Sequence, residues 1–140
     1  MSVGRICTRE VCTATANETV ADVARRMAEY NVGCVVVLDE AGLPLSVVTD
    51  RDLVVQVLAS ESDPVGTTVL DILSPDLKTI QEDAPLEDAL RLMRTSGCRR
   101  LPVLNDKGIL IGIIALDDVL SLLAEEFGSI NGILKKQATA

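Results

Sequence analysis

The stretch TATANETVADVARRM, residues 13–27, recurs further along the chain as TIQEDAPLEDALRLM, residues 79–93. Thr13 aligns with Thr79 and Met27 with Met93, so the offset from 13 to 79 is 66 residues. The same offset carries Asp52 onto Asp118 without a gap. A repeat at one fixed offset indicates that the chain is built from two copies of a single structural unit.

Each copy contains a helical pattern in which apolar residues recur at intervals of three and four. These residues are Val20, Val23, Ala24 and Met27 in the first copy, and Leu86, Ala89, Leu90 and Met93 in the second. We expect Thr19 to cap the first helix, with Asp22 three residues later, and Asp83 and Pro85 to mark the start of the second.

Two strand patterns and a second helix follow in each copy. The strands are predicted at CVVVLD and LSVVT in the first copy and at RLPVLN and LIGIIA in the second, and each pair is joined by a turn with glycine, Gly42 or Gly108. The closing helices are expected at about residues 50–60 and 116–127. A short strand-like segment also ends at Thr13 or Thr79, ahead of the first helix, so each copy has the order β-α-β-β-α.

These patterns predict an α+β fold with two repeats at residues 5–60 and 71–128, a linker at 61–70 and a C-terminal tail at 129–140. A unit of about 60 residues has a marginal core by itself. We therefore expect the two copies to pack sheet to sheet with pseudo-twofold symmetry, leaving a groove lined by equivalent strand ends.

The composition excludes several classes of function. The net charge of −8 disfavours nucleic acids, and the two aromatic residues, Tyr30 and Phe127, are too few for base stacking. The N-terminus lacks the apolar core of a signal peptide, and the longest apolar run, residues 109–116, is too short to cross a membrane. We expect a soluble cytoplasmic protein.

The chain has no histidine, so neither an enzyme nor a metal site is predicted. None of the four cysteines forms a CxxC pair. Cys34 and Cys98 adjoin strands and are expected to be buried. A redox switch remains open, and labelling of the native thiols would test it.

The duplicated pattern, the RLPVLN run, SVVTDRD (residues 46–52) and GIIALDD (residues 112–118) together resemble a pair of CBS domains, or Bateman module. The signature at the last two segments is Gly-h-x-Thr/Ser-x-x-Asp, where h is apolar. The resemblance covers nearly the whole chain. It implies a regulatory module, without catalysis, that binds an adenosine-containing ligand, with AMP, ADP or ATP preferred.

In the first repeat the resemblance makes Thr49 and Asp52 ligand-contacting residues, with the hydroxyl on phosphate or ribose and the carboxylate on ribose. Arg51 could pair with phosphate. The same Thr-x-x-Asp pattern is also a capping box, in which the two side chains only hold the helix start. Ser46 departs from the signature, where glycine is usual.

The second repeat has Gly112 and Asp118 but carries Ala115 in place of the hydroxyl residue. A carboxylate kept without its capping partner suggests a separate use. Arg99 and Arg100 resemble the family's basic pair, which contacts phosphates. The alternative for these arginines is a solvated strand entrance.

The resemblance also implies that each pocket draws on both repeats. Thr79 and Ile80 are then expected near Asp52, and Thr13 and Ala14 near Asp118. The full predicted set is Thr13, Ala14, Thr49, Arg51, Asp52, Thr79, Ile80, Arg99, Arg100 and Asp118. No cofactor is required, although acidic residues could hold Mg²⁺ with a nucleotide's phosphates.

Two functions stay open. The first is a sensor that transmits ligand binding to an effector protein. The second is a scaffold or oligomerisation module that binds no nucleotide. The apolar residues of 119–127 suit packing against a partner helix and equally suit covering the protein's own core. Because the resemblance implies dimerisation through such helices, a homodimer is expected.

Overall fold

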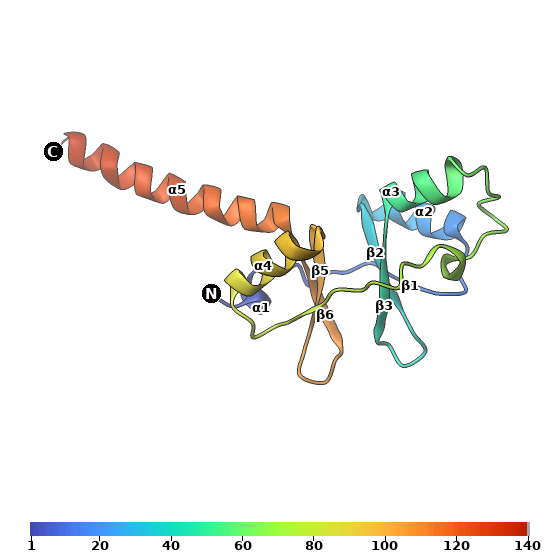
Figure 1. Ribbon diagram of the computed structural model, residues 1–140. Helices are drawn as coiled ribbons and strands as arrows, with labels where there is room; N and C mark the ends of the chain where they lie inside the picture. Colours follow the sequence, from blue (N-terminus) through green and yellow to red (C-terminus); the bar gives the residue numbers. More distant parts are fainter. Residues whose placement is uncertain (140) are drawn as a thin grey trace.

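The first repeat is a three-stranded sheet with helices on one face. The computed structural model describes residues 1–139 (Figure 1). The elements of this repeat are β1 (Thr13–Thr15), α2 (Val20–Tyr30), β2 (Cys34–Leu38), β3 (Pro44–Thr49), α3 (Asp50–Leu53) and a π-helical turn (Val54–Leu58). Strand β1 is parallel to β2, and β2 is antiparallel to β3, in the order β1-β2-β3.

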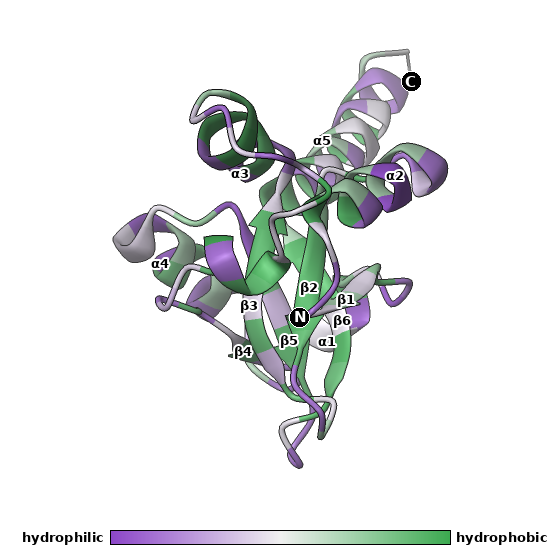
Figure 2. Cartoon of the chain, turned by 90° about the vertical axis from the view of Figure 1, so that its right-hand side faces the viewer, coloured by the Kyte–Doolittle hydropathy of each residue, from purple (hydrophilic) through white to green (hydrophobic). Residues whose placement is uncertain are grey.

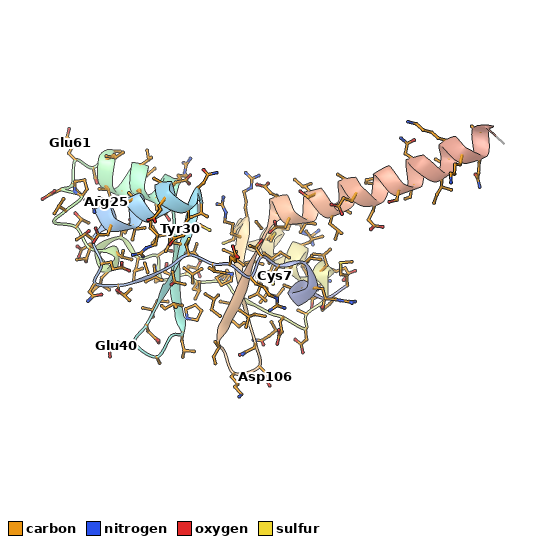
Figure 3. The ribbon with its side chains drawn as sticks, turned by 180° about the vertical axis from the view of Figure 1, so that it is seen from behind. Cys7, Arg25, Tyr30, Glu40, Glu61 and Asp106 are labelled. Carbon is orange, nitrogen blue, oxygen red and sulfur yellow. The ribbon has the colours of Figure 1, made fainter. Side chains whose placement is uncertain are left out.

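The second repeat has the same topology. Its elements are β4 (Ile80–Gln81), α4 (Leu86–Ser96), β5 (Arg100–Leu104), β6 (Leu110–Ala115) and α5 (Leu116–Thr139), with the sheet order β4-β5-β6. The register irregularity at Val37/Leu38 recurs at Val103/Leu104, 66 residues later. Figure 3 shows Glu40 and Asp106, also 66 residues apart, at the tips of two hairpins on the same side of the molecule. The predicted α+β repeat is confirmed.

The predicted helix start and turns are confirmed. The Thr19 hydroxyl oxygen accepts from the Asp22 N–H at 3.2 Å and caps α2, whereas Pro85 begins α4 without a side-chain cap. Both hairpins turn through a glycine with positive φ, at Gly42 and Gly108, a conformation that residues with a β-carbon rarely adopt.

Each sheet is buried on both faces. Val35 and Val37 of β2 face the helices of the first repeat and belong to its apolar core. Val36 between them is fully buried yet lies outside both cores, as expected for a side chain on the opposite face of the strand. Its equivalent Pro102 is buried as well. This pattern is that of two sheets packed face to face, and Figure 2 shows the strands as the most apolar part of the chain.

The two repeats exchange their first elements. Helix α1 (Val3–Ile6) packs into the core of the second repeat, and the 3-10 helix Val69–Ile72 packs into the core of the first. The Val3 N–H donates to Ala84 O at 2.8 Å, and 66 residues later the Val69 N–H donates to Glu18 O at 2.9 Å. Repeat boundaries drawn at 5–60 and 71–128 did not anticipate this exchange.

The signature position occupied by Ser46 and Gly112 shows where the two repeats differ. A β-carbon at Gly112 would lie 2.7 Å from Thr8 O, because residue 8 pairs with β6 through Ile113. In the first repeat the Ser46 hydroxyl instead donates to Ser74 O at 3.2 Å. The glycine is therefore needed only where a neighbouring backbone comes this close.

The expected end of the last helix near Phe127 was wrong. Helix α5 continues to Thr139, so the segment predicted as a tail at 129–140 is helical over its described part. Residue 140 lies outside the described residues. Figure 1 shows α5 leaving the body of the molecule as a long straight rod. No helix in the described part of the chain is long and apolar enough to span a membrane.

Candidate functional site

The strand-to-helix junction of the first repeat is a closed capping box. The Thr49 N–H donates to Asp52 Oδ2 at 2.8 Å, and the Asp52 N–H donates to the Thr49 hydroxyl oxygen at 3.2 Å. The cap is the alternative that the sequence left open, and the structure shows it formed. The cap uses neither the Thr49 hydroxyl hydrogen, which is a donor, nor the second oxygen of Asp52, which is an acceptor. Arg51, beside them, is exposed.

The equivalent junction in the second repeat retains half of this box. The Ala115 N–H donates to Asp118 Oδ2 at 3.0 Å. Asp118 therefore caps the start of α5 even without a hydroxyl at position 115. The retained carboxylate thus has a structural use through one oxygen, and the separate use that the sequence suggested for it stays a prediction.

A small hollow lies at this second junction. It has a volume of about 140 Å³, and we call it the arginine hollow; its lining residues are Arg99, Arg100, Ala115, Leu116 and Asp117. Two predicted residues, Arg99 and Arg100, thus face the start of α5. A helix of this length carries partial positive charge at its N-terminus, so both features favour an anion.

Arg100 also reaches toward the first repeat. A β-carbon at Gly33 would lie 3.4 Å from Arg100 Nη2 and 3.2 Å from Asp50 Oδ2. Gly33 thus leaves room for the guanidinium beside the first repeat's own strand-to-helix junction. The arginine hollow therefore lies where the two repeats meet.

A larger hollow opens on the first repeat. It has a volume of about 520 Å³, and we call it the tyrosine hollow; its lining residues are Glu10, Val11, Cys12, Thr13, Arg26, Tyr30 and Val32. Tyr30, labelled in Figure 3, is an exposed side chain of α2. Arg26 donates to Thr13 O at 2.7 Å and pairs with Glu18. The hydrogen bond from Arg26 holds the pKa of Glu18 below its usual value, so this pair is charged at neutral pH.

The thiol of Cys34 is influenced by residues of both hollows. Burial raises the pKa of its thiol, and the positive charge of Arg100 opposes that shift. Cys12, a lining residue of the tyrosine hollow, raises the pKa further. The charge on Arg100 and the thiol of Cys12, one lining residue of each hollow, thus both act on Cys34.

The cysteines are free thiols of intermediate exposure. The expectation that Cys34 and Cys98 are buried was thus only partly right. Among the described residues, no group of three or more cysteine and acidic side chains is placed to hold a metal ion.

The predicted pairings across the repeats, with Thr79 and Ile80 near Asp52 and Thr13 and Ala14 near Asp118, stay predictions. Thr13 lies in the tyrosine hollow, but Ala14 is buried in the first core and Ile80 in the second. No hydrogen bond within residues 1–139 joins Thr79 or Ile80 to Asp52, or Thr13 or Ala14 to Asp118. Sequence reasoning missed Val32, which belongs to no motif, and it did not select Asp117 as a predicted site residue although Asp117 lies within GIIALDD.

The comparison with family models agrees with this arrangement. The model described as CBS domain matches residues 3–59 and again residues 69–125. The chain belongs to the CBS-domain family. The two matches begin at α1 and at the 3-10 helix, the elements that the repeats of this CBS pair exchange.

A curated relative spans nearly the whole chain. The uncharacterized protein MK0525 of Methanopyrus kandleri is 35% identical over 136 residues, which covers 97% of this CBS pair and 69% of the relative.

Solved CBS pairs share the fold. The CBS domain pair of protein MJ0100, in complex with 5-methylthioadenosine and S-adenosyl-L-methionine, aligns with a TM-score of 0.80 at 22% identity over 90% of this chain and 98% of that one. The CBS domain protein PAE2072 of Pyrobaculum aerophilum, complexed with AMP, aligns with a TM-score of 0.77 at 23% identity over 84% and 89%.

Proposed function

We propose that this CBS pair is a regulatory module that binds an adenosine-containing ligand, with AMP, ADP or ATP preferred, between its two repeats. The observation that carries the proposal is the arginine hollow. There, Arg99 and Arg100 face the N-terminal end of a long helix at the boundary between the repeats. In a chain of net charge −8, two adjacent arginines at such a boundary need a local reason, and a bound phosphate supplies one.

The rest of the ligand would extend toward the tyrosine hollow. Its volume of about 520 Å³ is in the range of small-molecule sites. Val11 and Val32 offer apolar contact to a base, and backbone groups near Thr13 offer hydrogen bonds. The second carboxylate oxygen of Asp118 could accept from a ribose hydroxyl while the first keeps its cap. The AMP and S-adenosyl-L-methionine complexes of PAE2072 and MJ0100 support an adenosine ligand.

We propose that the first repeat's junction is the weaker site. Gly33 and Cys34 stand where the second repeat has its arginines, and Thr49 and Asp52 bond to one another. Mg²⁺ would enter only with the phosphates of a bound nucleotide.

Regulation follows if the ligand contacts both repeats. A ligand shifts a conformational equilibrium only by its difference in affinity for the two states. A ligand held by Arg100 and by the tyrosine hollow would favour one relative orientation of the repeats. An effector protein would read that orientation, and the module itself would have no catalytic activity.

A scaffold that binds no nucleotide is the second candidate. The closed capping box favours it, because in the first repeat both signature side chains have a structural use. The two candidates differ in whether any adenosine ligand stabilises the protein.

Thermal denaturation with AMP, ADP, ATP and S-adenosylmethionine tests the proposal. A ligand at 100 times its Kd stabilises the fold by about 2.7 kcal/mol, which raises Tm by several degrees in a chain of this size. The shift should disappear in Arg100→Gln and persist in Arg25→Gln, where the exposed arginine pairs only with Asp22 on α2. No shift with any ligand at millimolar concentration would favour the scaffold. An equal shift in both variants would show that the ligand binds without Arg100, outside the arginine hollow.

A further inference from the structure

The outer part of α5 is not buried against the body of the protein. Every residue from Leu123 to Ala138 is exposed. Figure 1 shows this part of the helix running away from both sheets. The family match ends at residue 125, so the segment is largely an addition to the CBS pair.

Helix α5 carries an exposed apolar stripe with the spacing of a coiled coil. Its members follow one another at intervals of three and four residues: Leu120, Leu123, Phe127, Ile130 and Leu134. That spacing is the a/d pattern, which faces a partner helix along a single seam. Their side chains are 43–69% exposed in the single chain. We call these five residues the α5 seam.

A helix of this composition needs a partner to be stable. Gly128 and Gly132 lie within it, and each costs about 1 kcal/mol relative to alanine. Ser129 and Asn131 are poor helix formers, and most helical stability in proteins comes from packing of an apolar face. The α5 seam must therefore be covered for the segment to remain helical.

We propose that a second copy of this chain covers the α5 seam, with the two α5 helices packed antiparallel. The distribution of charge along α5 identifies this partner. The half near the body carries Asp117, Asp118, Glu125 and Glu126, whereas the outer end carries Lys135 and Lys136. Antiparallel packing brings the acidic half of each helix to the basic end of the other. Parallel packing would set acid against acid in a chain that already carries a net charge of −8.

The area of the stripe fits a dimer. The seam and the neighbouring Ile133 expose roughly 500–600 Å² on each helix, against about 800 Å² per partner in a standard interface. A patch of this size reaches the upper end of what a monomer leaves uncovered. The lysines and acids along its edges would enlarge the contact.

The pairing has a consequence for the ligand site. If the helices cross near Phe127, the lysines of the second copy lie close to Asp117, which lines the arginine hollow. The proposal does not depend on the proposed function, because it concerns a segment that no ligand contact requires.

Sedimentation equilibrium of the full chain and of two matched variants tests the pairing. Ile130→Asp places a charge in the α5 seam, and Ser129→Asp places the same charge on the neighbouring outward position. The native chain and Ser129→Asp should show the same assembly at micromolar concentration, and Ile130→Asp should fall to half that mass with the same Tm for the CBS body. A monomeric native chain, or an Ile130→Asp variant of undiminished mass, would overturn the proposal.

Cysteine cross-linking in a background without the four native cysteines tests the orientation. Phe127→Cys lies near the centre of the antiparallel pair and should form a disulfide between copies on mild oxidation. Leu134→Cys should not, because its counterpart lies at the far end of the partner helix. Efficient cross-linking at both positions would show parallel helices and contradict the charge argument.

Discussion

Asp52 and Asp118 occupy the same signature position, and each accepts from the backbone N–H at the start of its helix. The two junctions differ by one hydroxyl group. Thr49 completes a reciprocal box in the first repeat, whereas Ala115 leaves the second box half made. At the scale of the residue, a short signature can thus serve helix capping and ligand contact through different atoms of one side chain.

Exchanging the residues at this position should change stability in opposite directions. Thr49→Ala removes a cap and should lower the free energy of unfolding by about 1 kcal/mol. Ala115→Thr should complete the second box and raise it by about 0.5–1 kcal/mol, because the arginine hollow leaves room for a hydroxyl. Urea denaturation checks both variants, and a destabilised Ala115→Thr would show that the hollow is already tightly filled.

The Glu18–Arg26 pair predicts a specific dependence on pH. The hydrogen bond from Arg26 lowers the pKa of Glu18, so the folded state favours the ionised carboxylate. Its contribution to stability is therefore complete above the unfolded pKa near 4.5 and is lost as the pH falls through the folded pKa. Glu18→Gln should lower stability by about 1 kcal/mol at pH 7, and the deficit should shrink below pH 4.5.

Urea denaturation of Glu18→Gln from pH 7 down to pH 3 measures this loss, with Arg26→Gln as the partner variant. Both deficits should shrink as the pH falls, because each variant removes the pair, but Arg26→Gln should keep a constant additional deficit because it also loses the bond to Thr13 O. A deficit that is constant across the range would mean that the side chain acts through packing instead of charge.

At the scale of the element, the order β-α-β-β-α could be predicted from sequence because helices and strands have different hydrophobic periods and because caps and turns mark their ends. The apolar spacing of α2 and α4, the runs of β2 and β5, and the glycine turns are all local signals. The exchange of α1 with its equivalent could not be predicted in this way, since a four-residue helix has no period and its partner is 66 residues away.

The length of α5 was missed for a different reason. Gly128 and Gly132 read as helix breakers when the helix is considered alone. Their cost is tolerable only if the apolar face of the helix is packed, and a local reading of helix propensity does not include that packing.

The exchanged helix yields a prediction. Val3 is fully buried in the second core although it belongs to the first repeat by sequence. Val3→Ala should lower stability by about 1–3 kcal/mol and should weaken amide hydrogen-exchange protection in β5 and β6 more than in β2 and β3. Val69→Ala is the matched control and should show the reverse pattern. Equal loss in both sheets for both variants would mean that the two cores unfold as one unit.

At the scale of the whole molecule, two nearly symmetric repeats carry an asymmetric pair of junctions. The hydrogen bonds of the exchanged elements repeat with the 66-residue offset, but Arg99 and Arg100 have no basic counterpart at Gly33 and Cys34. The predicted Arg99, Arg100, Asp118 and Thr13 came from the family resemblance; the two arginines line the arginine hollow and Thr13 lines the tyrosine hollow. Within residues 1–139, Ala14 makes no hydrogen bond to Asp118 and Ile80 makes none to Asp52. The sequence could not predict this, because it depends on the packing of Ala14 and Ile80 in the two cores.

Isothermal titration of AMP and ATP into the full chain tests the central claim most directly, because it measures affinity and stoichiometry together. The account predicts one ligand per chain, with binding lost in Arg100→Gln and retained in Thr49→Ala. Two ligands per chain, or binding that survives Arg100→Gln and fails in Thr49→Ala, would contradict it by placing the working site at the first repeat's junction.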